Sequence, residues 1–85
     1  MLQTYKPYHT LKQSLFDEMK DLIDEYERKT ATPEEVKEMI AQWKKTCGLL
    51  FLEPGTNRLT KRARERMLGV RRATIVQAFL DDMGE

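Results

Sequence analysis

Basic side chains are concentrated in one short stretch of this chain. Positions 58 to 72 hold seven lysines and arginines and a single acid, Glu65, although the whole chain of 85 residues has a formal net charge of only +1. The seven bases are Arg58, Lys61, Arg62, Arg64, Arg66, Arg71 and Arg72. Such a concentration of cations is typical of surfaces that bind the phosphates of nucleic acid or an acidic face of another protein.

Residue types that usually carry catalysis are sparse and poorly spaced. The lone cysteine, Cys47, and the lone histidine, His9, are far apart in sequence, and no helical periodicity brings His9 near a nucleophile. Adjacent acids such as Glu34 and Glu35 do not face each other on a helix. No glycine-rich phosphate loop or metal-ligand spacing is present. We therefore expect no enzyme activity, no cofactor and no metal, with Cys47 serving as a small buried hydrophobe.

Composition indicates a folded protein without a membrane anchor. Hydrophobic residues make up 40% of the chain and charged residues 34%, a balance typical of one globular domain, here residues 1–85. The longest apolar run is Leu49–Leu52, far shorter than the roughly 20 residues of a membrane span. The first residues carry no apolar signal core, and a lone cysteine agrees with a reducing compartment. We therefore expect a cytoplasmic protein with no membrane partner.

The first half of the chain has the periodicity of two amphipathic helices. Apolar residues recur at helical spacing over 10–29, where Thr10 and Gln13 match a capping box. Thr32 before Pro33 predicts the start of a second helix over 33–46, whose stripe ends in Trp43, a core position. Residues 1–9 are expected to form an arm that packs across these helices.

A short apolar segment at 49–59 follows the second helix. Its Pro54-Gly55 dipeptide suits a type II turn. Two readings fit: a two-stranded ribbon that pairs Leu49–Leu52 with Asn57–Leu59, which we favour, or an irregular apolar loop. Either must lie on the helices because an isolated two-stranded ribbon is not stable.

The C-terminal part reads as two helices rather than one. Its apolar stripes before and after Gly69 are about half a turn out of phase, so a straight helix cannot bury both. We predict a third helix over 60–68 with Thr60 as N-cap, and a fourth over 71–83. The predicted fold is mostly α: a small four-helix single domain with a ribbon or loop between the second and third helices. Its expected core consists of Leu15, Phe16, Met19, Ile23, Val36, Ile40, Trp43, Phe51, Met67, Val70, Val76, Phe79 and Leu80.

The C-terminal helix pair resembles the helix-turn-helix of DNA-binding proteins. Leu68-Gly69-Val70 is similar to the turn of that motif, and Ile75 with Ala78 or Phe79 matches the apolar positions of its second helix. The first helix departs from the pattern, which usually places an apolar residue and then a small residue where this chain has Arg64 and Glu65. Ala63 would replace the small residue only if the turn were two residues longer.

We expect the basic residues, and the polar residues beside them on the last helix, to have two roles. Arg58, Lys61, Arg62, Arg64 and Arg66 are candidates for anchoring phosphates, and Arg71, Thr74 and Gln77, with Ala78, are candidates for contacting base edges. Arg72 points toward the apolar side of its own helix, so we expect it to cap a helix or to pair with an acid of the first helix. The sequence thus predicts a non-catalytic, regulatory protein that binds nucleic acid. The alternative is a small adaptor or inhibitor that docks this basic patch on an acidic or nucleic-acid-mimicking protein surface.

Charge is also unevenly distributed along the chain. Residues 10–39 hold nine acids and five bases, a net charge of −4, whereas residues 44–72 hold nine bases and two acids, a net charge of +7. This polarity has three possible uses: to bind the two parts of one molecule together, to pair two molecules as a homodimer, or to present two faces to two partners.

Overall fold

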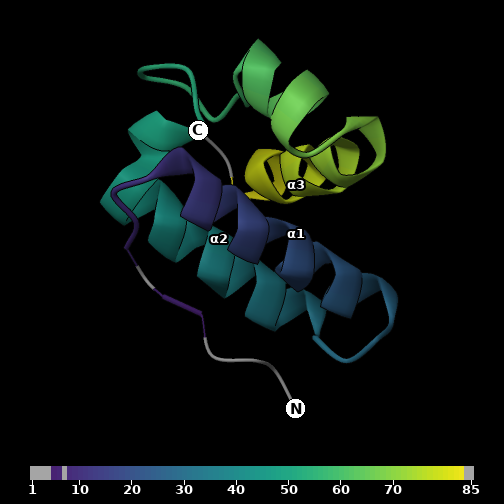
Figure 1. Ribbon diagram of the computed structural model, residues 1–85. Coiled ribbons are helices and arrows are strands. Elements are labelled where there is room, and N and C mark those ends of the chain that lie inside the picture. The colour runs from purple at the N-terminus through teal and green to yellow at the C-terminus, as the bar shows by residue number, and fades with distance from the viewer. Residues whose placement is uncertain (1–4, 7, 84–85) are drawn as a thin grey trace.

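Two antiparallel helices form the base of the structure, a computed structural model that describes residues 5–6 and 8–83. Helices α1 (Lys12–Glu27) and α2 (Pro33–Cys47) lie side by side in Figure 1. The turn between them passes through Lys29, whose φ of 65° is left-handed, and the Thr30 amide donates to the Glu25 carbonyl at 2.9 Å. The Thr30 hydroxyl, at 3.0 Å, and the Ala31 amide, at 3.3 Å, donate to the same carbonyl, so the turn satisfies this acceptor at the end of α1.

The two helix starts differ in how they are capped. The capping box predicted for α2 is confirmed: the Glu35 amide donates to the Thr32 hydroxyl at 3.1 Å, and the Thr32 amide donates to the Glu35 carboxylate at 2.8 Å. The box predicted at Thr10 is wrong, because α1 begins one residue later with Leu11 as an N-cap that makes no side-chain cap bond. Gln13, its expected partner, instead donates to Asp17 within the helix.

Trp43 lies at the centre of the core, as predicted. Its side chain is 0% exposed, and the indole N–H donates to the Lys6 carbonyl at 2.7 Å. Tyr5 and His9 contact the indole edge to face, with ring centroids 6.2 and 6.1 Å away. The expected packing of the N-terminal arm across the helices is therefore confirmed for these residues, whereas positions 1–4 and 7 of the arm lie outside the described residues.

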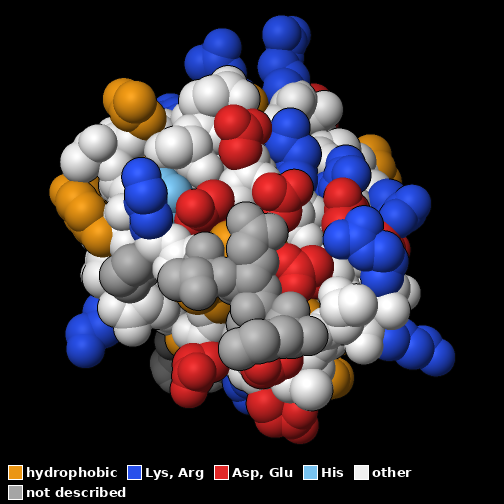
Figure 2. All heavy atoms as spheres, turned by 60° about the horizontal axis from the view of Figure 1, so that its bottom comes forward, with side chains coloured by type: hydrophobic (Ala, Val, Ile, Leu, Met, Phe, Trp, Pro, Cys, Tyr) orange, Lys and Arg blue, Asp and Glu red, His pale blue; other side chains and the backbone are white. Residues whose placement is uncertain are grey.

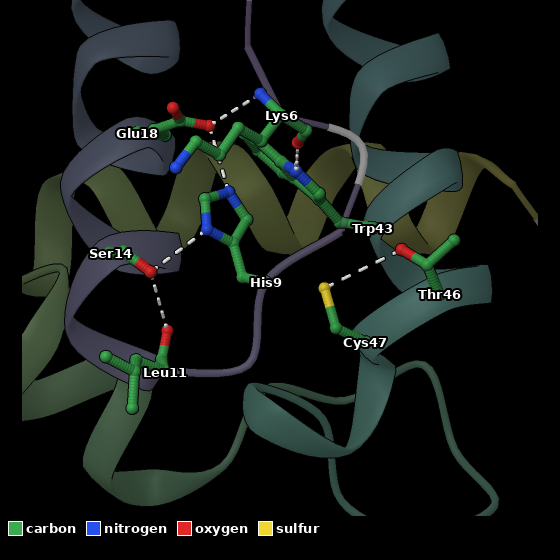
Figure 3. Close-up of polar contacts among 8 residues, drawn as sticks. All are labelled: Lys6, His9, Leu11, Ser14, Glu18, Trp43, Thr46 and Cys47. Atoms are coloured by element: carbon green, nitrogen blue, oxygen red, sulfur yellow. Dashed lines mark hydrogen bonds and ion pairs between the residues drawn. The ribbon is translucent and has the colours of Figure 1, made fainter.

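Polar bonds hold the same arm against α1. Figure 3 shows the His9 ring between α1 and Trp43, with Nε2 2.9 Å from the Glu18 carboxylate and Nδ1 3.0 Å from the Ser14 hydroxyl. The Lys6 amide also donates to Glu18, at 2.9 Å. Further along α1, the buried Tyr5 hydroxyl donates to the buried Glu25 carboxylate. The arm therefore closes the open side of the α1/α2 pair.

The Tyr5 hydroxyl is expected to make the stability of the fold depend on pH. Burial, and then the hydrogen bond to Glu25, raise the pKa of this phenol above its ordinary value. When folding raises the pKa of an acidic group, the resulting stabilisation is complete at any pH below the pKa of that group in the unfolded chain. For a tyrosine this stabilisation is lost as the pH rises above about 10. We expect the difference in unfolding free energy between wild type and Tyr5→Phe to shrink by about 1 kcal/mol from pH ~9 to pH ~11 in urea titrations. A difference that stays constant over this range would contradict the assignment.

The segment after α2 does not form the predicted ribbon. Residues Gly48–Leu50 form a short 3-10 helix, η1, and the only pairing within the described residues is a single antiparallel bridge between Leu52 and Leu59. The ladder stops because its next backbone groups are bonded elsewhere: the Phe51 amide donates to the Gly48 carbonyl at 3.1 Å, and the Thr60 carbonyl accepts from the Arg64 amide at 3.0 Å. On the outer edge of the same segment, the Gln77 side chain donates to the Asn57 carbonyl at 2.9 Å and accepts from the Leu59 amide at 3.0 Å, so these two groups also have partners.

The C-terminal part forms two helices that meet at Gly69, as predicted. Residues 61–67 are helical, ending in the π-helix η2 (Ala63–Met67), and α3 spans Val70–Asp82. The Ala63 amide donates to the Thr60 hydroxyl at 3.1 Å, which confirms Thr60 as a cap, and Gly69 has a φ of 84° that favours glycine. Helix α3 packs against both α1 and α2, and residues 61–67 lie against α3 (Figure 1).

The predicted core is largely confirmed, with one correction. Most of the expected residues are buried, and Met67 and Phe79 are partly buried against them. Val70 is wrong: it is 73% exposed at the start of α3, while Leu68 on the other side of Gly69 is buried. The left-handed glycine redirects the chain, so the apolar residue before it turns inward and the one after it turns outward.

None of the helices in the described part of the chain has the length and apolar character needed to cross a bilayer.

Candidate nucleic-acid interface

The basic helix, residues 61–67, presents its charged side chains to solvent. Its apolar side is held by Ala63, which is buried, and by Leu68, which follows the helix and is also buried. The Leu68 amide donates to the Ala63 carbonyl at 2.9 Å, an i to i−5 bond that defines the π turn and brings these two residues to one side. The bases between and beside them are left exposed: Lys61, Arg62, Arg64 and Arg66.

Arg64 and Glu65 stand where a helix-turn-helix would bury an apolar and a small residue, and the π turn adds one residue where the pattern needs two, so the resemblance is not confirmed. Both side chains are exposed, and the small buried residue of this helix is Ala63. A π turn accommodates one more residue than an α turn, so the chain reaches Gly69 with Ala63 still facing the core. The charged residues therefore need not be buried.

The bases of this helix have no acidic partner in the described part of the chain. We use the term basic surface for the four exposed bases of the basic helix together with exposed Arg58. No ion pair joins any of these five to an acid of residues 5–6 or 8–83. Glu65 is the one acid on the helix itself, where it lines an open hollow with Lys61, Arg62 and Arg66. Four cations on seven residues with one acid leave a net positive surface that attracts anions.

Arg72 is paired with the first helix, as predicted. Its Nε and Nη2 atoms donate to the two carboxylate oxygens of Asp24, each at 3.1 Å, in the bidentate geometry that suits a guanidinium. The hydrogen bonds that Arg72 donates to Asp24 raise the pKa of its guanidinium above the ordinary value. This pair fastens α3 to α1.

Arg71, a candidate for contacting bases, is also engaged with α1. Its guanidinium forms a bidentate ion pair with Glu27, although the Arg71 side chain remains 72% exposed. The acids and bases at this point therefore hold two parts of one molecule together, which is the first of the three uses considered for the uneven charge.

Figure 2 shows another face, where acidic side chains gather in the middle and Lys and Arg project around the edge.

The remaining positions expected on the open face of α3 differ from one another. Thr74 is exposed, and its hydroxyl donates to the Val70 carbonyl of its own helix at 2.8 Å. Ala78 is exposed and Gln77 is half-buried. The Gln77 amide holds the 57–59 backbone and also donates to Asp81 at 3.0 Å, so both of its polar atoms are engaged within the protein.

We expect Gln77→Ala to destabilise the protein. Removing the amide leaves the N–H of fully buried Leu59 without its partner, which costs about 1–3 kcal/mol. Urea unfolding measures this loss, and Thr74→Ala on the same helix is the matched control, expected to change the unfolding free energy by less than about 0.5 kcal/mol. Equal effects of the two substitutions would show that Gln77 does not hold the loop.

Sequence reasoning missed the acid that pairs with Arg71, and it did not specify the acid that pairs with Arg72. Asp24 and Glu27 stand three residues apart on α1, and adjacent arginines on α3 reach one each. The i, i+3 spacing places the two acids on one face of a helix, which is a usable signal, but only the packing of α3 against α1 shows that this face meets the arginines.

The fold and surface define a small, mostly helical protein with an exposed basic helix, and the described residues contain no cluster of three or more metal-ligating side chains. Comparison of the chain with protein-family models, with curated proteins and with solved structures gives no match.

Proposed function

We propose that this protein binds nucleic acid without catalysis, in a regulatory role, and that the basic surface makes the phosphate contacts. The observation that carries the proposal is the separation of the bases into two sets. Arg71 and Arg72 are neutralised by acids of α1, while the five bases of the basic surface are exposed and have no acidic partner among the described residues.

A polyanion is the ligand that best suits the five unpaired bases of the basic surface. Like charges held close together repel, and the repulsion is relieved when condensed counterions on a nucleic acid are exchanged for these side chains. Arginine and lysine side chains on one helix can each reach a different phosphate. In this proposal the basic helix and α3 form a helix-turn-helix-like pair, in which the first helix contributes most of the contacts.

An NMR titration tests the proposal residue by residue. We add an unlabelled duplex of about 20 base pairs to the 15N-labelled protein at ~50 mM salt, where electrostatic binding is strong. We expect amide shift changes that concentrate at residues 58–67 and are small in the α1–α2 turn, residues 28–32. Absence of any shift change, or changes confined to another face, would contradict the proposal. A protein partner captured equally well after nuclease treatment would instead support the adaptor alternative.

A further inference from the structure

The geometry points to a more specific ligand, an inference that rests on the proposed function: the nucleic acid is a duplex, held through its phosphates without regard to base sequence. The chemistry of this ligand is a dense array of phosphates on a rigid double helix. Three observations support it, and they concern the base-reading positions, the aromatic residues and the spacing of charge.

The α3 side chains that are suited to reading nucleotide bases already make hydrogen bonds within the protein. Direct readout requires side chains such as arginine or glutamine to present both donors and acceptors to base edges. Arg71 is held by Glu27, and the polar atoms of Gln77 are held by the 57–59 backbone and Asp81. Thr74 donates its hydroxyl to its own helix. Helix α3 therefore offers little that could distinguish one base pair from another.

Aromatic stacking platforms are absent from the basic surface. Proteins that bind single strands stack the unpaired bases on exposed aromatic rings. This chain has one Trp, three Tyr and three Phe, and none of them belongs to the basic surface. Tyr26 and Phe79 pack edge to face on each other, with ring centroids 5.3 Å apart, and the one strongly exposed ring, Tyr8, belongs to the N-terminal arm. A single strand would gain nothing here from its bases.

The density of charge matches a duplex better than a single strand. A helix of seven residues is about 10 Å long, since each residue rises 1.5 Å. Over about 10 Å of axis a duplex presents roughly six phosphates, whereas one strand presents roughly three. The four bases of the basic helix outnumber the roughly three phosphates of one strand over this length, and Arg58 before the helix adds a fifth cation, so the charge is matched better by the duplex.

Fluorescence anisotropy with four labelled probes tests the inference. The probes are a DNA duplex of about 20 base pairs, a second DNA duplex of unrelated sequence, an RNA duplex of the same length and the single DNA strand, all at ~50 mM salt. We expect the two DNA duplexes to agree within about twofold and the single strand to bind at least about fivefold more weakly than the better class of duplex. The kind of duplex that binds more tightly, DNA or RNA, is identified as the source of the phosphates.

Two results would overturn the inference while leaving the proposed function intact: a single strand that binds as tightly as every duplex, or a difference of more than about tenfold between the two DNA sequences. No binding to any probe would contradict both the inference and the proposed function.

Arg71→Ala adds a second readout, because loss of a backbone or structural contact changes affinity for both DNA sequences by the same factor. A change in their ratio would show that Arg71 reads bases.

Discussion

Trp43→Ala is expected to remove a large share of the stability of this protein, about 4 kcal/mol of unfolding free energy. The indole is fully buried between the helices and the N-terminal arm, and its N–H holds the Lys6 carbonyl. Truncation leaves a cavity that such a small core cannot close, and it also releases the arm. A domain of this size has a total stability of only about 4–13 kcal/mol, so the variant should be partly unfolded at 37 °C.

Urea denaturation followed by circular dichroism measures this loss. Trp43→Phe is the matched control, because it keeps an aromatic ring and loses only the N–H and part of the volume, at a cost of about 1–2 kcal/mol. Tyr8→Ala, at a ring that is 55% exposed, should change stability by less than about 0.5 kcal/mol. A loss below about 1 kcal/mol for Trp43→Ala would show that the arm and the indole do not form the core described above.

Replacing Lys61, Arg62, Arg64 and Arg66 together by glutamine is expected to lower duplex affinity about 100-fold, which corresponds to about 2.7 kcal/mol. Each cation removed is one fewer phosphate contact and one fewer counterion released. The fold should survive, because the four side chains are exposed and make no ion pair with a described acid. Equal unfolding free energies for the variant and wild type would confirm this.

A matched variant separates local contact from general charge. Glutamine at Lys12, Arg28, Lys29 and Lys45 removes the same four charges from exposed positions on α1, the following turn and α2. We expect a loss of no more than about threefold, since these positions are outside the basic surface and act only through the screened net charge. Similar losses in the two variants, measured by anisotropy side by side, would show that the basic surface is not the binding site.

The helices were predictable because their signals are local. Amphipathic periodicity, the Thr32 capping box and the break at Gly69 depend on residues within one or two turns, and each is confirmed. The ribbon at 49–59 failed because the turn at Gly48–Leu50 takes the Phe51 amide and the start of the basic helix takes the Thr60 carbonyl, the two groups that the next ladder bond would join. Val70 failed because the direction of a side chain beside Gly69 depends on a left-handed φ that periodicity does not include.

The candidate site was predictable in its charge and only partly in its geometry. The basic stretch is visible in the sequence, and the pairing of Arg72 with an acid of the first helix follows from its inward position. The exposure of Arg64 agrees with its predicted place among the phosphate-anchoring bases, whereas the pairing of Arg71 with Glu27 depends on how α3 crosses α1. Packing of distant segments decides that pairing, so it cannot be read from spacing at 100° per residue.

The salt dependence of duplex affinity for the wild-type protein tests the central claim most directly. If the basic surface contacts four to five phosphates, log K plotted against log salt between about 50 and 200 mM should have a slope of about −4. A slope between 0 and about −1, or no binding at ~50 mM salt, would contradict the assignment of the basic surface to a nucleic-acid backbone.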